Sequence, residues 1–224
     1  MNSNMTVTKR CGARETIDLD KIHRVITWAA KGLKNVCVSE VELRTHLQFF
    51  DGIPTEAIHE TIIKSAADLI SPESPDYQFL AARLAVFHLR KKAFGQFEPP
   101  KLYDHVTKLV ELGKYDMHIL QDYTREELDI MDTYIDHWRD MNFSYAAVKQ
   151  LEGKYLVQNR VTHEIYESAQ FLYILVAACL FARYPKATRL QYVKDFYDAV
   201  STFKISLPTP IMAGVRTPTR QFSS

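Results

Sequence analysis

Three lysines in the first part of the chain have the type and the spacing to hold a phosphate group. Lys9 follows alternating β-branched residues, Lys21 stands in the first turn of an expected helix, and Lys91 continues the apolar stripe of a later helix. A cation in the first turn opposes the helix macrodipole at a cost of roughly 0.3–1 kcal/mol. A bound anion beside Lys21 would offset this cost and so account for a lysine at this position. Explanations without a bound phosphate stay open. Most segments of this kind are ordinary capped helices behind a hairpin, and most lysines that follow the apolar stripe of a helix extend to solvent.

Two short segments and a helix would have to position the first two lysines. Thr6–Arg10 and Arg14–Ile17 alternate in the manner of strands, and the turn between them contains a glycine, which predicts a β-hairpin. Asp18 and Asp20 then offer capping oxygens ahead of a helix that opens at Lys21. The hairpin is therefore expected to run directly into a helix.

Three more helices are expected before the middle of the chain. One begins at Ser39, one begins with Thr55 as its cap, and one ends near Gly95. His59 shares a face with Thr55, four residues earlier. Three ammonium groups that such a unit brings together would suit a triphosphate. Since the chain has no G-x-x-x-x-G-K-[ST] loop, we expect binding without hydrolysis.

The second half of the chain predicts a mostly helical domain that follows the helix breaker Pro99-Pro100. Helices are expected over Lys101–Leu112, Thr124–Trp138, Ala169–Phe181 and Lys186–Ser201, and a short hairpin over Lys154–Val157 and Glu164–Tyr166. The helix from Thr124 would open with a capping box formed by Thr124 and Glu127, and the apolar helix Ala169–Phe181 would be buried. The tail Ser206–Ser224 contains three prolines and no helical period, which indicates a loop.

The composition excludes several classes of protein. The chain has 224 residues, 25% of them charged, and a net charge of +1, which gives no argument for nucleic acid, a membrane or a polyanion as partner. Its three cysteines are far apart and form no C-x-x-C pair, so we expect no metal site and a reducing compartment. The N-terminus lacks the apolar core of a signal peptide, and the most apolar run has 13 residues, too few to span a bilayer. We expect a cytoplasmic protein.

The longer pattern V-x-K-R-x-G…E-x-I-x-x-x-K-I, followed by a helical unit, resembles the ATP-cone domain, a regulatory nucleotide-binding module. Ile58–Ala67, Pro75–Pro100 and Phe143–Arg160 look like the large α subunit of the class I, aerobic, enterobacterial-type ribonucleotide reductases. The resemblance covers the whole chain and implies a mainly α fold in three parts. These are an ATP cone (1–95, a β-hairpin plus a four-helix unit), a helical domain (96–205) and the start of a catalytic α/β barrel (206–224).

The resemblance also implies which residues bind ligands. The cone would bind ATP or dATP, with Mg²⁺, as an allosteric effector, and its lysines would meet the phosphates. The implied effector-binding residues are Lys9, Glu15, Thr16, Ile17, Asp18, Leu19, Asp20, Lys21, Thr55 and Lys91, with Arg10 and His59 as neighbours. Asp18 stands where the family commonly has asparagine, and a carboxylate adds negative charge and cannot donate a hydrogen bond. Thr209 and Ser224 are implied as substrate-binding residues.

The family's reaction reduces ribonucleoside diphosphates to 2′-deoxyribonucleoside diphosphates for DNA synthesis. The resemblance implies an αα homodimer, a β subunit that supplies a di-iron tyrosyl radical, and thioredoxin or glutaredoxin as reductant. We expect no catalytic residue in this fragment, since the family's first reducing cysteine follows Ser224, and Cys179 lies in an apolar helix. Two alternatives without catalysis stay open. One is a stand-alone ATP-cone regulator, which would need a zinc ribbon and a basic face, and the other is a helical interaction module with a degenerate cone.

Overall fold

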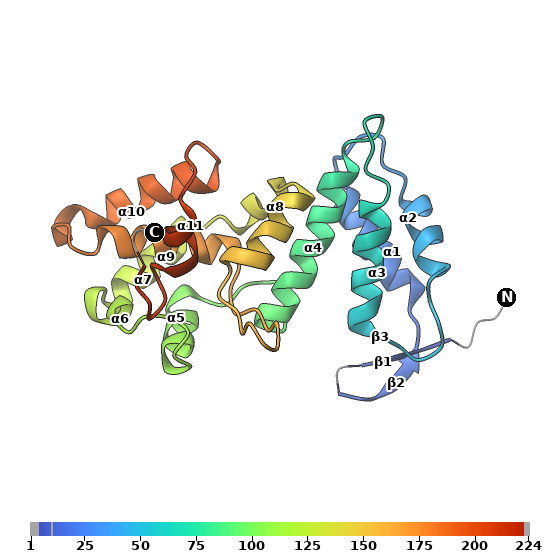
Figure 1. The fold of residues 1–224 in the computed structure, drawn as a ribbon, viewed down its shortest axis with the longest axis horizontal. Coiled ribbons are helices and arrows are strands. Elements are labelled where there is room, and N and C mark those ends of the chain that lie inside the picture. The colour runs from blue at the N-terminus through green and yellow to red at the C-terminus, as the bar shows by residue number, and fades with distance from the viewer. Residues whose placement is uncertain (1–4, 10, 222–224) are drawn as a thin grey trace. The chain divides into compact units, whose positions relative to one another are not determined.

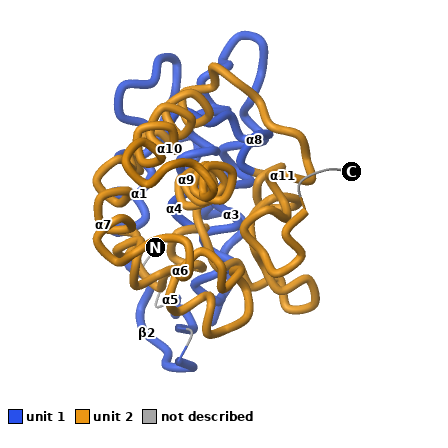
Figure 2. Tube along the Cα trace, turned by 90° about the vertical axis from the view of Figure 1, so that its left-hand side faces the viewer, with its two compact units in different colours: residues 1–88, 141–148 blue, residues 89–140, 149–224 orange. Residues whose placement is uncertain are grey.

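The fold is mainly α-helical, as the sequence predicts, in a computed structural model that describes residues 5–9 and 11–221 (Figure 1). The chain forms two compact units, residues 1–88 with 141–148 and residues 89–140 with 149–224 (Figure 2). The described helices are α1 (Leu19–Ala30), α2 (Val38–His46), α3 (Thr55–Ala67), α4 (Tyr77–Phe94), α5 (Leu102–Glu111), α6 (His118–Asp122), α7 (Arg125–Tyr134), the 3-10 helix η1 (His137–Asn142), α8 (Tyr145–Gln150), the π-helix η2 (Leu151–Tyr155), α9 (Ala169–Phe181), α10 (Lys186–Ser201) and α11 (Thr209–Gly214).

A three-stranded sheet lies at one end of the helices of the first unit (Figure 1). The central strand β1 (Thr6–Thr8) pairs antiparallel with β2 (Arg14–Thr16) and parallel with β3 (Ile53–Pro54). The predicted hairpin is confirmed, with strands shorter than expected. The sequence analysis missed β3, because a strand of two residues is too short to show any periodicity.

Aliphatic side chains from the helices and the sheet form the core of the first unit. They include Val7, Ile22, Ile26, Val41, Ile53, Ile58, Ile62, Leu80 and Leu84. Arg83 on α4 donates hydrogen bonds to the carbonyls of Ala29 at 3.0 Å and Lys31 at 2.8 Å. These carbonyls lie at the end of α1, where a helix leaves acceptors without an intrahelical partner. The guanidinium therefore ties the end of α1 to α4.

Two predicted helix starts are wrong, that of α2 by two residues and that of α3 by one. α2 begins at Val38, with Cys37 rather than Ser39 as its N-cap, and no side-chain capping bond forms there. α3 begins at Thr55 itself, because Pro54 at the end of β3 already has the extended backbone of an N-cap, with ψ 140°. Thr55 is thus the first helical residue and not the cap.

The apolar helix α9 is the centre of the second unit, and its residues 169–178 are all buried. This confirms the predicted buried helix, against which α10 packs. The predicted capping box at the start of α7 is also confirmed, since the Thr124 hydroxyl accepts the Glu127 N–H while the Glu127 carboxylate accepts the Thr124 N–H. None of the described helices combines the length and apolar character needed to cross a bilayer.

The short hairpin predicted for the second unit is present in part. Gln158 and Ile165 form an antiparallel bridge, and the Tyr166 N–H donates to the Val157 carbonyl at 3.0 Å, but Lys154 and Tyr155 lie in the π-helix η2 and not in a strand. The tail is not a loop throughout, because Thr209–Gly214 forms α11. Its prolines do not prevent this helix, since Pro208 is the N-cap and Pro210 lies in the first turn, where a missing N–H costs little.

Two histidines, the buried His105 and the half-buried His137, make the stability of the second unit depend on pH. Burial lowers the pKa of His105 to about 4, and burial together with the Arg90 charge lowers that of His137 to about 4. Between about pH 6.5 and 4 the unfolded chain binds more protons than the folded chain, so the stability falls as the pH falls. The loss approaches about 1.4 kcal/mol per pH unit for each histidine.

We expect His105→Phe to roughly halve this slope, because the aromatic ring that stacks on Phe171 is kept and one titrating group is removed. Urea unfolding at several pH values between neutral and about pH 5 gives the free energy of unfolding at each pH, and hence the slope. Equal slopes for the two proteins would contradict the assignment.

Candidate functional site

The parallel pairing of β1 with β3 brings Lys9 next to Thr55. Thr8 lies opposite Pro54 in the register of the two strands, and Lys9 and Thr55 are the residues that follow. α3 begins at Thr55, so the N–H groups of its first turn lie at the same edge of the sheet as the lysine. A helix N-terminus and an ammonium group both favour an anion.

Side chains fasten the turn before β3 to β1 and so fix this register. Asp51 Oδ1 accepts hydrogen bonds from the Thr6 N–H at 2.7 Å and the Thr6 hydroxyl at 2.8 Å, which hold the pKa of Asp51 below its usual value. The Thr8 hydroxyl donates to the Gly52 carbonyl at 2.9 Å. Gly52 has a φ of +79°, and a side chain there would collide with the Arg14 guanidinium.

The Lys9 ammonium lies 2.6 Å from Glu15 Oε1 on the neighbouring strand β2. The side chains are 34% and 52% exposed, so this ion pair contributes at most about 1 kcal/mol and can be exchanged for another anion. All three residues of β2, including Thr16, are exposed. The lysine is therefore held in place at an accessible edge of the sheet.

A second helix N-terminus follows β2 directly. Asp18 is the N-cap of α1, and its Oδ1 accepts the Lys21 N–H at 2.8 Å, which confirms the predicted cap. The helix begins at Leu19, two residues earlier than expected, so that Lys21 lies in its first turn. Leu19, Asp20 and Lys21 are exposed, and Ile17 is half-buried.

The remaining predicted residues lie elsewhere. Lys91 is on the part of α4 that belongs to the second unit, four residues after Phe87. Thr209 is the first residue of α11, also in the second unit, and its hydroxyl lies 3.3 Å from that of Tyr155. Arg10 and Ser224 lie outside the described residues. Of the predicted site residues, the structure pairs Lys9 with Glu15, and the register of Thr8 with Pro54 places Lys9 and Thr55 one residue further along adjacent strands.

The sequence analysis missed an aromatic cluster on three helices of the first unit. The ring of Phe87 on α4 lies 5.8 Å from that of Trp28 on α1 and 5.9 Å from that of His59 on α3, measured between centroids. All three side chains are half-buried. Phe87 belongs to the apolar stripe that Lys91 continues, so the pattern indicated only a core position, whereas a purine base could stack on such rings.

Cys179 has the environment expected of an unreactive cysteine. Burial raises the pKa of its thiol to about 12, so it carries no thiolate at neutral pH. Cys11 and Cys37 are exposed and, like Cys179, are free thiols.

Two family models match the chain. The ATP cone domain matches residues 5–92, and the ribonucleotide reductase all-alpha domain matches residues 141–220. Ribonucleoside-diphosphate reductase 1 subunit alpha of Escherichia coli (strain K12) is 78% identical over all 224 residues, which correspond to 29% of that protein. The subunit alpha of Haemophilus influenzae is 77% identical over all 224 residues and 30% of its length. That of Enterobacteria phage T4 is 45% identical over 98% of the chain and 29% of the phage protein. The chain spans less than a third of these relatives.

Proposed function

This chain carries the ATP cone and the all-alpha domain of the ribonucleotide reductases, and on that premise we propose that its first unit is an allosteric domain that binds ATP and dATP. The observation that supports this most is the parallel register of β1 and β3, which places Lys9 and Thr55, the first residue of α3, one residue beyond the paired Thr8 and Pro54.

In the proposed complex the phosphates take the position that the Glu15 carboxylate holds beside Lys9. Lys21 and Lys91 provide further cations, and the Thr55 hydroxyl provides a hydrogen bond. The segment 15–18 contacts base and sugar, and Leu19 and Asp20 belong to the same wall of the site. Mg²⁺ accompanies the nucleotide. The domain binds the nucleotide without hydrolysing it.

For the longer protein to which this chain corresponds, we propose the activity that its relatives' names state, the reduction of ribonucleoside diphosphates. Thr209 and Ser224 contact the substrate, and the parts 1–95, 96–205 and 206–224 are its cone, helical domain and start of the barrel. The protein works in the cytoplasm as an αα dimer with a β subunit that carries a di-iron tyrosyl radical, and thioredoxin or glutaredoxin reduces it. ATP and dATP regulate it only if they bind its active and inhibited assemblies with different affinity.

Calorimetric titration of the chain with ATP, dATP and AMP tests the proposal. ATP and dATP should each bind saturably, and AMP at least about tenfold more weakly, because it lacks the phosphates that the lysines would meet. A sample that is folded by circular dichroism and gives no binding heat with millimolar ATP would contradict the proposal.

Asp18→Asn should strengthen ATP binding while leaving the stability unchanged. Asparagine is as good an N-cap as aspartate, so the bond to the Lys21 N–H is kept and the free energy of unfolding should change by less than about 0.5 kcal/mol. Removing one negative charge near the phosphates should raise the affinity by about two- to fivefold. Calorimetry and urea unfolding measure the two effects, and an unchanged or lower affinity would place the phosphates elsewhere.

A further inference from the structure

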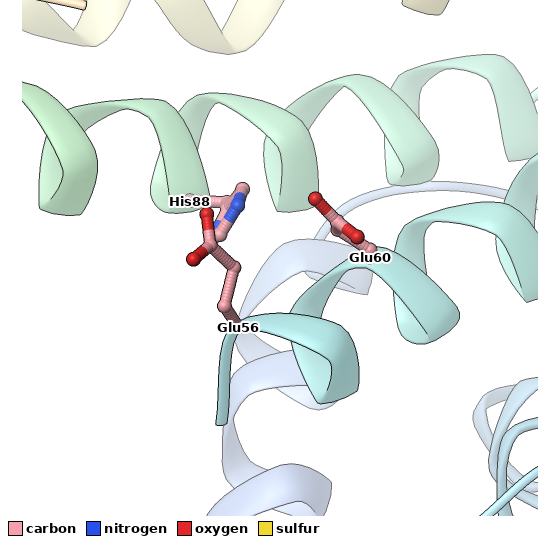
Figure 3. Close-up of side chains that lie close together, drawn as sticks. All are labelled: Glu56, Glu60 and His88. Carbon is pink, nitrogen blue, oxygen red and sulfur yellow. The ribbon is translucent and has the colours of Figure 1, made fainter. Parts of the chain in front are cut away.

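We propose that Glu56, Glu60 and His88 form a binding site for a divalent transition-metal ion of the zinc class. One ligand atom from each residue lies within 4.8 Å of the other two. Figure 3 shows the two glutamate side chains rising from α3 toward α4, where His88 is located. The site uses protein donors alone and so does not depend on the proposed nucleotide function.

The positions of the three donors follow from the two helices. Glu56 and Glu60 are four residues apart on α3, so they share one face of that helix. Residues at this spacing are neighbours on the helix surface, so both carboxylates can reach one ion. His88 comes from a different helix, α4, so an ion at this place would link α3 to α4 within the first unit.

The chemistry of the donors selects the class of metal. Two carboxylate oxygens and one imidazole nitrogen suit Zn²⁺, Mn²⁺, Fe²⁺ or Co²⁺, whereas Mg²⁺ and Ca²⁺ prefer oxygen donors alone. His88 is only 5% exposed, so its ring is held in place, and it stacks on the His59 ring at 5.3 Å between centroids. Glu60 is exposed, which leaves an open path for the ion. Three protein ligands leave a further position for water.

The sequence analysis expected no metal site because it searched for cysteine pairs. His88 lies 28 positions after Glu60 in the sequence, so no short motif contains all three donors. His59 lies between the two glutamates on α3, and Glu56 directly follows Thr55. The proposed ion would thus sit close to residues proposed to bind the effector while using none of them.

Calorimetric titration of the nucleotide-free chain with Zn²⁺ tests the site. The exposed thiols would also bind zinc, so the background is the variant Cys11→Ser/Cys37→Ser. Zn²⁺ should bind saturably, and Glu60→Gln and His88→Gln should each weaken binding by at least about tenfold. The matched control is Glu42→Gln, which alters a different carboxylate–histidine pair of the same unit, with Glu42 Oε1 2.7 Å from His23 Nδ1. It should leave the zinc affinity unchanged.

A second measurement does not depend on the buried histidine tolerating substitution. In protein that keeps His88, Co²⁺ should shift the NMR signals of the His88 imidazole protons. Glu60→Gln, which changes an exposed side chain, should reduce this shift at the same Co²⁺ concentration. The proposal is overturned if folded protein binds no Zn²⁺, if Glu60→Gln binds it as tightly as the parent, or if an equal concentration of Mg²⁺ displaces it.

Discussion

Glu167→Gln is expected to lower the free energy of unfolding by about 3–5 kcal/mol, the largest stability effect that we predict. Glu167 and Arg216 are both fully buried in the second unit and form an ion pair. Glutamine keeps the shape of the side chain and removes its charge, so the Arg216 guanidinium would stay buried without a counter-ion.

The carboxylate of Glu167 also connects other parts of the second unit. It accepts hydrogen bonds from the Tyr115 hydroxyl at 2.6 Å and the Val157 N–H at 2.7 Å, and from Arg216 Nε at 3.0 Å. Arg216 in turn donates to the Tyr155 carbonyl at 2.9 Å. The pair therefore joins the segment after α11 to the segment around η2, and a substitution should loosen both.

Urea unfolding of the variant measures the loss. The control is Asp129→Asn, which breaks a solvent-exposed pair with Arg125 on α7 and should cost less than about 0.5 kcal/mol. Similar losses for Glu167→Gln and Asp129→Asn would mean that the buried pair does not stabilise the second unit as we argue.

Lys9→Ala is expected to weaken ATP binding by about ten- to a hundredfold. A hydrogen bond to a charged group is worth about 1.5–3 kcal/mol, and about 1.4 kcal/mol corresponds to a factor of ten. The stability should change little, because the pair of Lys9 with Glu15 is exposed to solvent. Calorimetric titration of the folded variant with ATP gives the ratio of affinities.

Lys64→Ala is the matched control for this substitution. It removes the same charge from the same unit, but Lys64 lies nine residues after Thr55 on α3, about 13 Å along the helix axis. Its effect on ATP affinity should stay below about twofold, because solvent and salt screen an exposed charge over that distance. Equal effects of the two substitutions would indicate a general effect of net charge and not a phosphate contact at Lys9.

Local features of the fold could be predicted from the sequence, and long-range features could not. The β-hairpin, the Asp18 cap, the Thr124 capping box and the apolar helix α9 each depend on neighbouring residues, and all are present. The strand β3 has two residues and exists only because β1 pairs with it, so its pattern was invisible. The start of α3 was misplaced for the same reason, since β3 supplies its N-cap.

Burial of charge was the second feature that the sequence concealed. Glu167 and Arg216 are 49 positions apart, and each looks like a surface residue until the fold places them together. His88 and the two glutamates on α3 are a similar case. For the candidate nucleotide site, the pattern of Lys9, Lys21 and Lys91 indicated an anion, whereas the ligand's identity came from the family resemblance. The proximity of Lys9 to Thr55 required the register of the parallel strands.

An amide NMR titration of the isotope-labelled chain with ATP would test the central claim most directly, because it locates the nucleotide. We predict that the amides of Lys9, of residues 15–21 and of Thr55 shift together and saturate with one binding constant, while the core amides of α9 and α10 stay in place. Shifts confined to the second unit, or no shifts in a spectrum with the dispersion of a folded protein, would contradict the claim that the first unit binds the nucleotide.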